Sequence, residues 1–183
     1  MVASELDGIG TEHLSELEHM GYDYVEMPLA EMMRLDGPNF LELKRRVDRL
    51  TIGCEVCNNF FPKHMRLTGQ EVRMDLVLSY AERALTRAKD LGATCVVFGS
   101  GSAKNVPKGT SLEKGYQQIV DLLNQIASLA ANRDIIICIE PLRKQECNLI
   151  NTFEEGGRLA DELRHPNIKV LADYFHMMAE AEP

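Results

Sequence analysis

Residues 135 to 176 open as Ile135-Ile-Ile-Cys-Ile-Glu140-Pro141 and close as Val170-Leu-Ala-Asp173-Tyr-Phe-His176-Met177. The stretch holds two short apolar runs, each followed by one carboxylate, with a helical pattern between them. Because the carboxyl ends of successive parallel strands meet at one edge of a sheet, Glu140 and Asp173 are expected to lie side by side. Two carboxylates at such an edge suit a divalent metal ion.

The same alternation of apolar strand and amphipathic helix runs along the rest of the chain. Near-continuous apolar strands separated by helices indicate a parallel sheet covered by helices. A (β/α)₈ barrel and a doubly wound open sheet share this local pattern. The predicted strands are 22–28, 52–58, 94–98, 135–139 and 168–172, and the predicted helices are 11–20, 39–50, 71–91, 111–132 and 152–164.

Residues at the predicted strand ends favour the barrel. A doubly wound sheet would concentrate its site near one switch point, whereas a barrel collects its site from many strand ends. Here polar residues or glycine stand at five such ends, namely Glu26, Asn58, Gly99, Glu140 and Asp173.

The expected fold class is therefore α/β, in the (β/α)₈ TIM barrel family, with residues 1–183 as a single domain. Residues 1–4 can supply only the end of a first strand, and the last predicted strand is the sixth. We expect an incomplete barrel of about six β/α units, short of the roughly 250 residues typical of the fold.

The composition of the chain limits the kinds of partner that we expect it to bind. The formal net charge of −8 argues against a nucleic-acid binder, which usually carries a basic patch. No run approaches the roughly 18 apolar residues of a membrane span, and residues 1–10 lack the basic start and apolar block of a signal peptide. A cytoplasmic protein without membrane contact is the expectation.

The five cysteines indicate a reducing compartment, because their count is odd and their spacing forms no disulfide framework. Cys54 and Cys57 form a C-x-x-C pair, but the surrounding residues are typical of a strand and no second pair completes a zinc site. Buried thiols are a better interpretation than redox or zinc chemistry.

Four segments carry a resemblance to a known family. Together they resemble the sugar isomerase and epimerase family with the xylose-isomerase-like TIM barrel, whose members include ketose 3-epimerases and hydroxypyruvate isomerases. The segments are Tyr22-Asp-Tyr-Val-Glu-Met-Pro-Leu29, Cys57-Asn-Asn-Phe-Phe-Pro62, Ile139-Glu-Pro-Leu-Arg-Lys-Gln-Glu-Cys-Asn-Leu-Ile-Asn-Thr152 and Leu171-Ala-Asp-Tyr-Phe-His-Met177.

The resemblance implies roles for individual residues. Glu140 matches a metal ligand that is also one of two acid/base carboxylates, and Asp173 matches a second ligand. Glu146 and His176 match residues that bind substrate hydroxyls beside the reacting carbons. The remaining matches, at pocket-lining positions, are Glu26, Cys57 and Gly99.

The implied chemistry suits these residue types. A hard cation, with Mn²⁺ expected first and Mg²⁺ or Co²⁺ as substitutes, polarises a sugar carbonyl so that a carboxylate can remove the neighbouring proton. Return of the proton to the opposite face of the resulting enediolate epimerises the carbon, and return to the adjacent carbon isomerises the sugar. The implied partner is a small sugar or ketose, and a homo-oligomer is compatible with the sequence.

The chain also departs from the family. The family's further His and Glu ligands and a substrate-binding Arg come from the seventh and eighth strands, whereas this sequence ends at Pro183 after the sixth. We therefore expect half of the metal site, and no activity from the 183 residues alone.

Two alternatives to a sugar isomerase stay open. The first is an abasic-site endonuclease of the same fold, which would need more histidine ligands and a basic groove. The second is a non-catalytic barrel fragment that binds a ligand or a partner.

Overall fold

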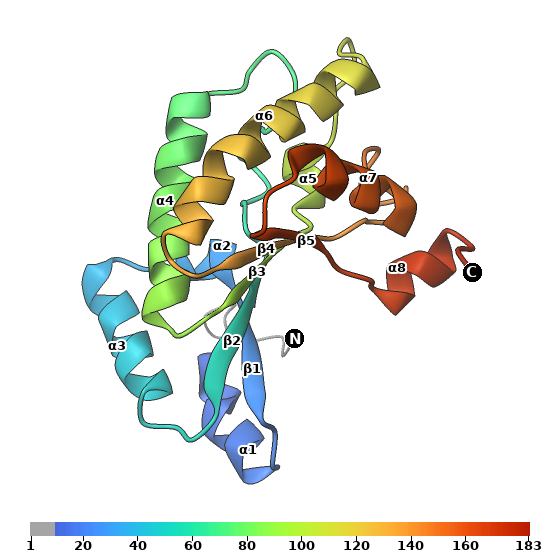
Figure 1. Cartoon of the computed structure of the whole chain (residues 1–183). Coiled ribbons are helices and arrows are strands. Elements are labelled where there is room, and N and C mark those ends of the chain that lie inside the picture. Colours follow the sequence, from blue (N-terminus) through green and yellow to red (C-terminus); the bar gives the residue numbers. More distant parts are fainter. Residues whose placement is uncertain (1–9) are drawn as a thin grey trace.

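The computed structural model describes residues 10–183, whose five strands form one parallel sheet (Figure 1). The strands follow one another in the order β1-β2-β3-β4-β5, so each pairs with its neighbours in the sequence. The further strand end predicted at residues 1–4 lies outside the described residues. The strands are β1 (Tyr24–Pro28), β2 (Gly53–Asn58), β3 (Cys95–Phe98), β4 (Ile136–Ile139) and β5 (Ile168–Val170).

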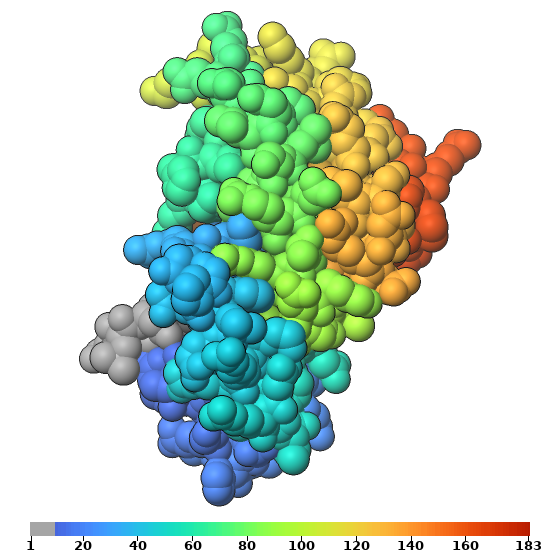
Figure 2. Space-filling model, turned by 90° about the vertical axis from the view of Figure 1, so that its left-hand side faces the viewer, coloured from blue at the N-terminus to red at the C-terminus, as the bar shows by residue number. Residues whose placement is uncertain are grey.

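Helices alternate with the strands and cover the sheet. Figure 1 shows α3, α4 and α6 on one side of it, and Figure 2, which faces that side, shows them as a continuous outer surface. The 3₁₀ turn Thr11–His13 precedes the helices α1 (Leu14–His19), α2 (Leu29–Met32), α3 (Gly37–Val47), α4 (Met74–Asp90), α5 (Gly101–Lys104), α6 (Leu112–Ala131), α7 (Phe153–Leu163) and α8 (Tyr174–Ala179). No helix among residues 10–183 combines the length and the apolar character needed to cross a membrane.

The sheet is an incomplete barrel, as the sequence predicts. Within residues 10–183, β1 and β5 each have a strand partner on one side only. The sheet therefore has two open edges, whereas a closed barrel has none.

The core lies between the sheet and its helices. Val96, Phe98, Ile137 and Ile139 are fully buried beneath the helices, and full burial of one such side chain contributes roughly 1.5–3 kcal/mol. Helices α4 and α6 pack against each other and bury a largely aliphatic row between themselves and the sheet. This packing fixes the strands, and with them the positions of the residues at the strand ends.

Polar side chains and glycines set several helix boundaries. The N-terminal turns of α3, α6 and α7 are capped by Asp36, Ser111 and Thr152, whose side chains accept hydrogen bonds from backbone N–H groups three residues later. At the other end, Gly92 follows α4 with a φ of 95°, a left-handed conformation that glycine adopts without strain. The predicted helices at these places match the observed ones to within three residues.

Three short helices were not predicted. They are α2, α5 and α8, of four, four and six residues, and each begins shortly after a strand. Fewer than two turns give almost no 3.6-residue periodicity, so the pattern in these segments is indistinguishable from that of a loop. These helices nonetheless carry several residues of the site.

Candidate active site

A cavity of about 750 Å³ lies at the carboxyl ends of the strands. This is the edge at which the sequence predicts a site. Every strand contributes residues at or beyond its end, so the cavity crosses the whole width of the sheet. Its charged and amide-bearing lining residues are Glu26, Glu31, Asn58, Asn59, Lys63, Asn105, Glu140, Gln145, Glu146, Asp173 and His176.

Glu140, Asp173 and His176 form a cluster in this cavity. One potential ligand atom from each residue lies within 4.8 Å of those of the other two. Glu140 directly follows β4, whereas Asp173 and His176 stand at the start of α8, after β5. The two carboxylates predicted to lie side by side are therefore brought together.

Asp173 caps α8. Its Oδ1 accepts hydrogen bonds from the backbone N–H groups of Phe175, at 2.7 Å, and His176, at 3.3 Å. These bonds use one carboxylate oxygen and fix the side chain, while the second oxygen is left for another partner.

His176 is nine-tenths buried and is oriented by the loop that follows β4. The backbone N–H of Arg143 donates to Nδ1 over 3.4 Å, a long hydrogen bond. A neutral imidazole that accepts at Nδ1 carries its proton on Nε2. In this tautomer Nε2–H is a hydrogen-bond donor.

The surroundings of Glu140 favour the protonated form of its carboxyl group. Burial, followed by the neighbouring carboxylates of Asp173, Glu26 and Glu146, raises the pKa of Glu140 to about 7 against the opposing effect of Lys104. A carboxyl group with this pKa exchanges its proton readily near neutral pH.

Gly99 leaves the space that the Glu140 side chain occupies. A Cβ atom built at Gly99 would collide with the Glu140 carboxylate, while the backbone of Gly99 is itself buried at the end of β3. Glycine is thus needed here for close packing of one residue against another. Gly99 packs against the Glu140 side chain, and it is not among the residues that line the cavity.

Lys104 lies fully buried beneath the same residue. Its Nζ donates to the backbone carbonyl of Glu140 over 3.1 Å and stands 5.5 Å from the ring centre of Phe98. Burial lowers the pKa of this lysine, partly offset by the nearby Cys147 and Glu140. A lysine with no exposed surface is rare, and this one ties the end of α5 to the end of β4. Its sequence context carried no signal of burial.

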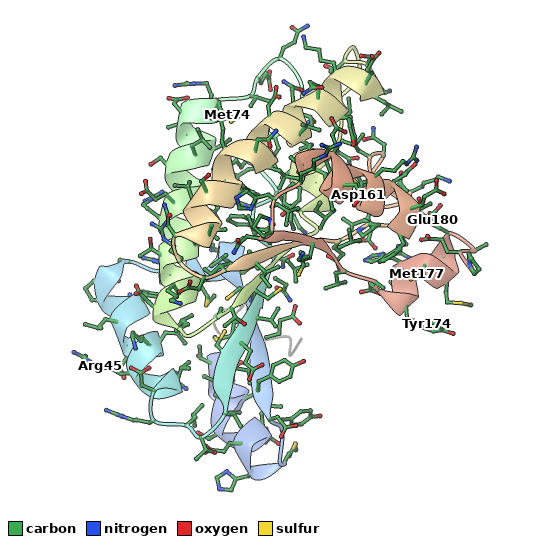
Figure 3. All side chains as sticks on the ribbon, in the orientation of Figure 1. Arg45, Met74, Asp161, Tyr174, Met177 and Glu180 are labelled. Atoms are coloured by element: carbon green, nitrogen blue, oxygen red, sulfur yellow. The ribbon has the colours of Figure 1, made fainter. Side chains whose placement is uncertain are left out.

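Arg143 connects the loop after β4 to α8. Its guanidinium lies over the ring of Phe175, 4.7 Å from the centre, and its Nε donates to Glu146 Oε1 over 2.7 Å. A hydrogen bond from the Lys144 backbone N–H to Glu180 also joins the loop to the end of α8. Figure 3 labels Glu180 at this end of the helix. Glu146 is thereby held at the cavity wall.

The structure brings five of the seven predicted site residues to the cavity. They are Glu26, Glu140, Glu146, Asp173 and His176. The structure does not bring Gly99 or Cys57 to the cavity wall. Cys57 is 0% exposed, with its Sγ 3.9 Å from that of Cys54, so it packs inside the fold as a buried thiol.

The comparison with family models matches residues 14–183 to the model described as "Xylose isomerase-like TIM barrel". The chain belongs to this family. D-psicose 3-epimerase of Ruminiclostridium cellulolyticum is 33% identical over 67 residues, which make up 37% of this chain and 23% of the epimerase. Because this match covers only part of each chain, it shows that the two proteins are related, and it does not identify the substrate of this chain.

Solved structures share the fold of this family member. A D-psicose 3-epimerase crystallised in the presence of D-fructose superposes with a TM-score of 0.83 at 20% identity, covering 95% of this chain and 61% of the epimerase. A family 2 AP endonuclease from Brucella melitensis gives 0.75 at 17% identity, covering 91% and 63%. The chain thus spans about six tenths of the length of each structure, and at these identities the likeness establishes the fold alone.

The raised pKa of Glu140 predicts a pH-dependent stability of the metal-free protein. The folded chain holds this proton up to about pH 7, whereas the unfolded chain releases it near the ordinary value of 4.5. The free energy of unfolding should therefore fall as pH rises from 4.5 to 7, by roughly 2–3 kcal/mol from this group. Glu140→Gln should remove that part of the slope in urea unfolding at pH 5 to 8 with chelator present. Glu154 is exposed, so Glu154→Gln is the control. If the free energy of unfolding changed with pH in the same way in the wild type and in Glu140→Gln, the raised pKa of Glu140 would be contradicted.

Proposed function

We propose that this protein is part of a metal-dependent sugar isomerase or epimerase that removes a proton next to a carbonyl group. The observation that carries the proposal is the half-buried Glu140 carboxyl, with a pKa of about 7 and with potential ligand atoms of Asp173 and His176 within 4.8 Å. The relatedness to a D-psicose 3-epimerase supports a ketose as the substrate class. A cytoplasmic location remains a prediction from the sequence.

Glu140 and Asp173 are the residues that would hold the metal. Carboxylate oxygens are preferred by hard divalent cations, so Mn²⁺ is the first candidate and Mg²⁺ and Co²⁺ are the substitutes. A cation also fits the electrostatics, because two carboxylates close enough to raise a pKa repel each other when both are ionised. When bound, the metal would supply Lewis-acid polarisation of the substrate carbonyl.

The protein's own residues would handle the proton and the substrate hydroxyls. Glu140 would accept the proton from the carbon beside the carbonyl, because its carboxylate lies at the cavity wall next to Asp173 and His176. The Nε2–H of His176 donates to a substrate oxygen, and Glu146 accepts from a hydroxyl while its other oxygen pairs with Arg143. Glu26 faces the same cavity and strengthens its negative potential.

The charge of the cavity speaks against the endonuclease alternative. Five carboxylates line the described cavity, from Glu26, Glu31, Glu140, Glu146 and Asp173, against one lysine, Lys63. Such a lining repels a phosphodiester backbone, whereas it suits a divalent cation and a neutral polyol. The AP endonuclease from Brucella melitensis shares the fold of this chain, and a shared fold is not evidence that this chain binds nucleic acid.

Titration with Mn²⁺ tests the proposal directly. We expect one site per chain by calorimetry, with affinity lowered about tenfold or more by either Glu140→Gln or Asp173→Asn, because each removes an oxygen ligand. The matched controls are Glu154→Gln and Asp161→Asn, both exposed on α7. Binding that survives in both site variants would place the metal elsewhere, and absence of binding in the wild type would favour the non-catalytic alternative.

Gly99→Ala should displace the Glu140 carboxylate without changing its chemistry. The added methyl group meets the far end of a flexible side chain, so the free energy of unfolding should change by less than about 1 kcal/mol while Mn²⁺ affinity falls about tenfold. Gly157→Ala on α7, whose Cβ would meet nothing within 4 Å, is the control. Unchanged Mn²⁺ affinity in Gly99→Ala would show that the carboxylate position does not matter for binding.

The isolated 183 residues are expected to give no net epimerisation. Inversion at carbon requires a base on each face, and Glu140 supplies one of them. Conversion of D-fructose by the Mn²⁺-loaded chain, followed by chromatography of the sugars, checks this. Metal-dependent formation of the C3 epimer that is lost in Glu140→Gln would refute the expectation and establish the activity.

A further inference from the structure

Two cysteines of the sheet bring their thiol groups into contact. The Sγ atoms of Cys95, on β3, and Cys138, on β4, lie 3.1 Å apart. Both residues are partly exposed. Each strand has a neighbour on both sides, so the backbone is enclosed by the sheet and the exposed surface belongs mostly to the side chains. Adjoining thiols that solvent can reach are a ligand set for a soft metal ion.

The thiol pair lies on the face of the sheet that points away from α4 and α6. Successive side chains of a strand point to opposite faces. Val96 and Ile137, the sequence neighbours of Cys95 and Cys138, are fully buried beneath the helices. The two cysteines therefore face the inner side of the incomplete barrel. Glu140 comes two residues after Cys138, so the pair lies roughly 7 Å further down the sheet than the candidate active site.

The register of the two strands disfavours a disulfide between the cysteines. Cys95 stands opposite Ile136, and Cys138 stands opposite Val97, so the cysteines are offset by two residues. With about 4.8 Å between strands and about 3.3 Å per residue along them, the two Cα atoms are roughly 8 Å apart. A disulfide spans about 4.4–6.8 Å between Cα atoms, so its formation would require the backbone to move. The thiols thus stay available as two separate ligands.

The described residues supply no further ligand of the usual kinds to this pair. Among residues 10–183, the group of three or more His, Cys, Asp or Glu that could hold a metal ion is the cluster of Glu140, Asp173 and His176. Structural zinc almost always takes four ligands, whereas the soft cation Cu(I) is held by two thiolates. With metal–sulfur bonds of about 2.3 Å, two thiolates on opposite sides of one ion stand about 4.6 Å apart. Rotation of either cysteine about its Cα–Cβ bond opens the contact to this distance.

We propose that Cys95 and Cys138 form a two-coordinate binding site for a soft monovalent cation, of which Cu(I) is the example. When the ion binds, two S–H bonds break, two metal–sulfur bonds form and two protons leave to solvent, without a change of oxidation state. This site does not depend on the proposed function, because the hard cation assigned to Glu140 and Asp173 prefers oxygen ligands. One face of the sheet would thus separate cations by softness.

Cys54 and Cys57 provide a comparison within the same chain. Their Sγ atoms are also close, at 3.9 Å, but these residues are 1% and 0% exposed. A cation reaches them only if the fold opens. Copper is therefore expected at the partly exposed pair and not at the buried pair.

The test is an anaerobic titration of the chain with Cu(I), in competition with the Cu(I) chelator bicinchoninic acid. We expect one ion per chain, with affinity lowered about 100-fold or more by either Cys95→Ser or Cys138→Ser, because a hydroxyl group is a poor ligand for a soft cation. Either serine variant suffices if the other does not fold. The matched controls Cys54→Ala and Cys57→Ala should keep the affinity, and circular dichroism checks that each variant is folded.

Two further measurements separate this site from the one at Glu140. X-ray absorption of the copper-loaded chain should show sulfur neighbours only, and Glu140→Gln should bind Cu(I) as tightly as the wild type does. Failure of the proposed Mn²⁺ site would show in the Mn²⁺ titration and leave these results unchanged.

Several outcomes would overturn the thiol site. They are equal Cu(I) affinity in the wild type and both serine variants, an equal loss in the Cys54→Ala or Cys57→Ala control, and no binding in competition with the chelator. A disulfide between Cys95 and Cys138, found by peptide mass spectrometry after the folded chain is treated with diamide, would also overturn it, because the pair would then be a redox couple.

Discussion

The geometry of this site depends on keeping the Glu140 carboxylate at the end of β4, largely out of water. Burial and a second carboxylate nearby both favour the neutral form, which raises its pKa to about 7. The neighbouring structure makes this position available in two ways. Gly99 has no side chain to occupy the space, and Lys104 places a buried ammonium group on the carbonyl of the same residue. Residues after β3 and in α5, namely Gly99 and Lys104, thus fit the position of Glu140 at the end of the next strand.

The loop after β4 owes its order to side-chain amides. The Asn151 Nδ2 donates to the carbonyls of Leu142 and Cys147, at 2.6 and 2.7 Å, inside the loop. The Asn148 amide exchanges two hydrogen bonds with the backbone of Val106, in the segment after α5. These side-chain hydrogen bonds take the place of the backbone hydrogen bonds that a strand would make. They hold the loop, and with it Arg143 and Glu146, in position. His176 and Phe175 then gain fixed partners although α8 has only six residues.

Much of this arrangement could be predicted from sequence, for physical reasons that differ between elements. Apolar runs such as 135–139 mark buried parallel strands directly, and a carboxylate placed after each of two such runs predicts the pairing of Glu140 with Asp173. The burial of Lys104 could not be predicted, because it results from contacts with β4 that are distant in sequence. Cys57 is the opposite case, a residue that was predicted to line the pocket and does not. The family resemblance placed this residue at the pocket, yet the shift of register between β1 and β2 at Val25 and Glu26 changes which side chains of β2 face the cavity.

The charge of the cavity accounts for several features at once. Carboxylates from β1, α2, the loop after β4 and α8 converge on one space, and those of Asp173, Glu26 and Glu146 add to burial in raising the pKa of Glu140. A divalent cation at the proposed site would offset this repulsion at the Glu140 end, where two carboxylates and an imidazole come together.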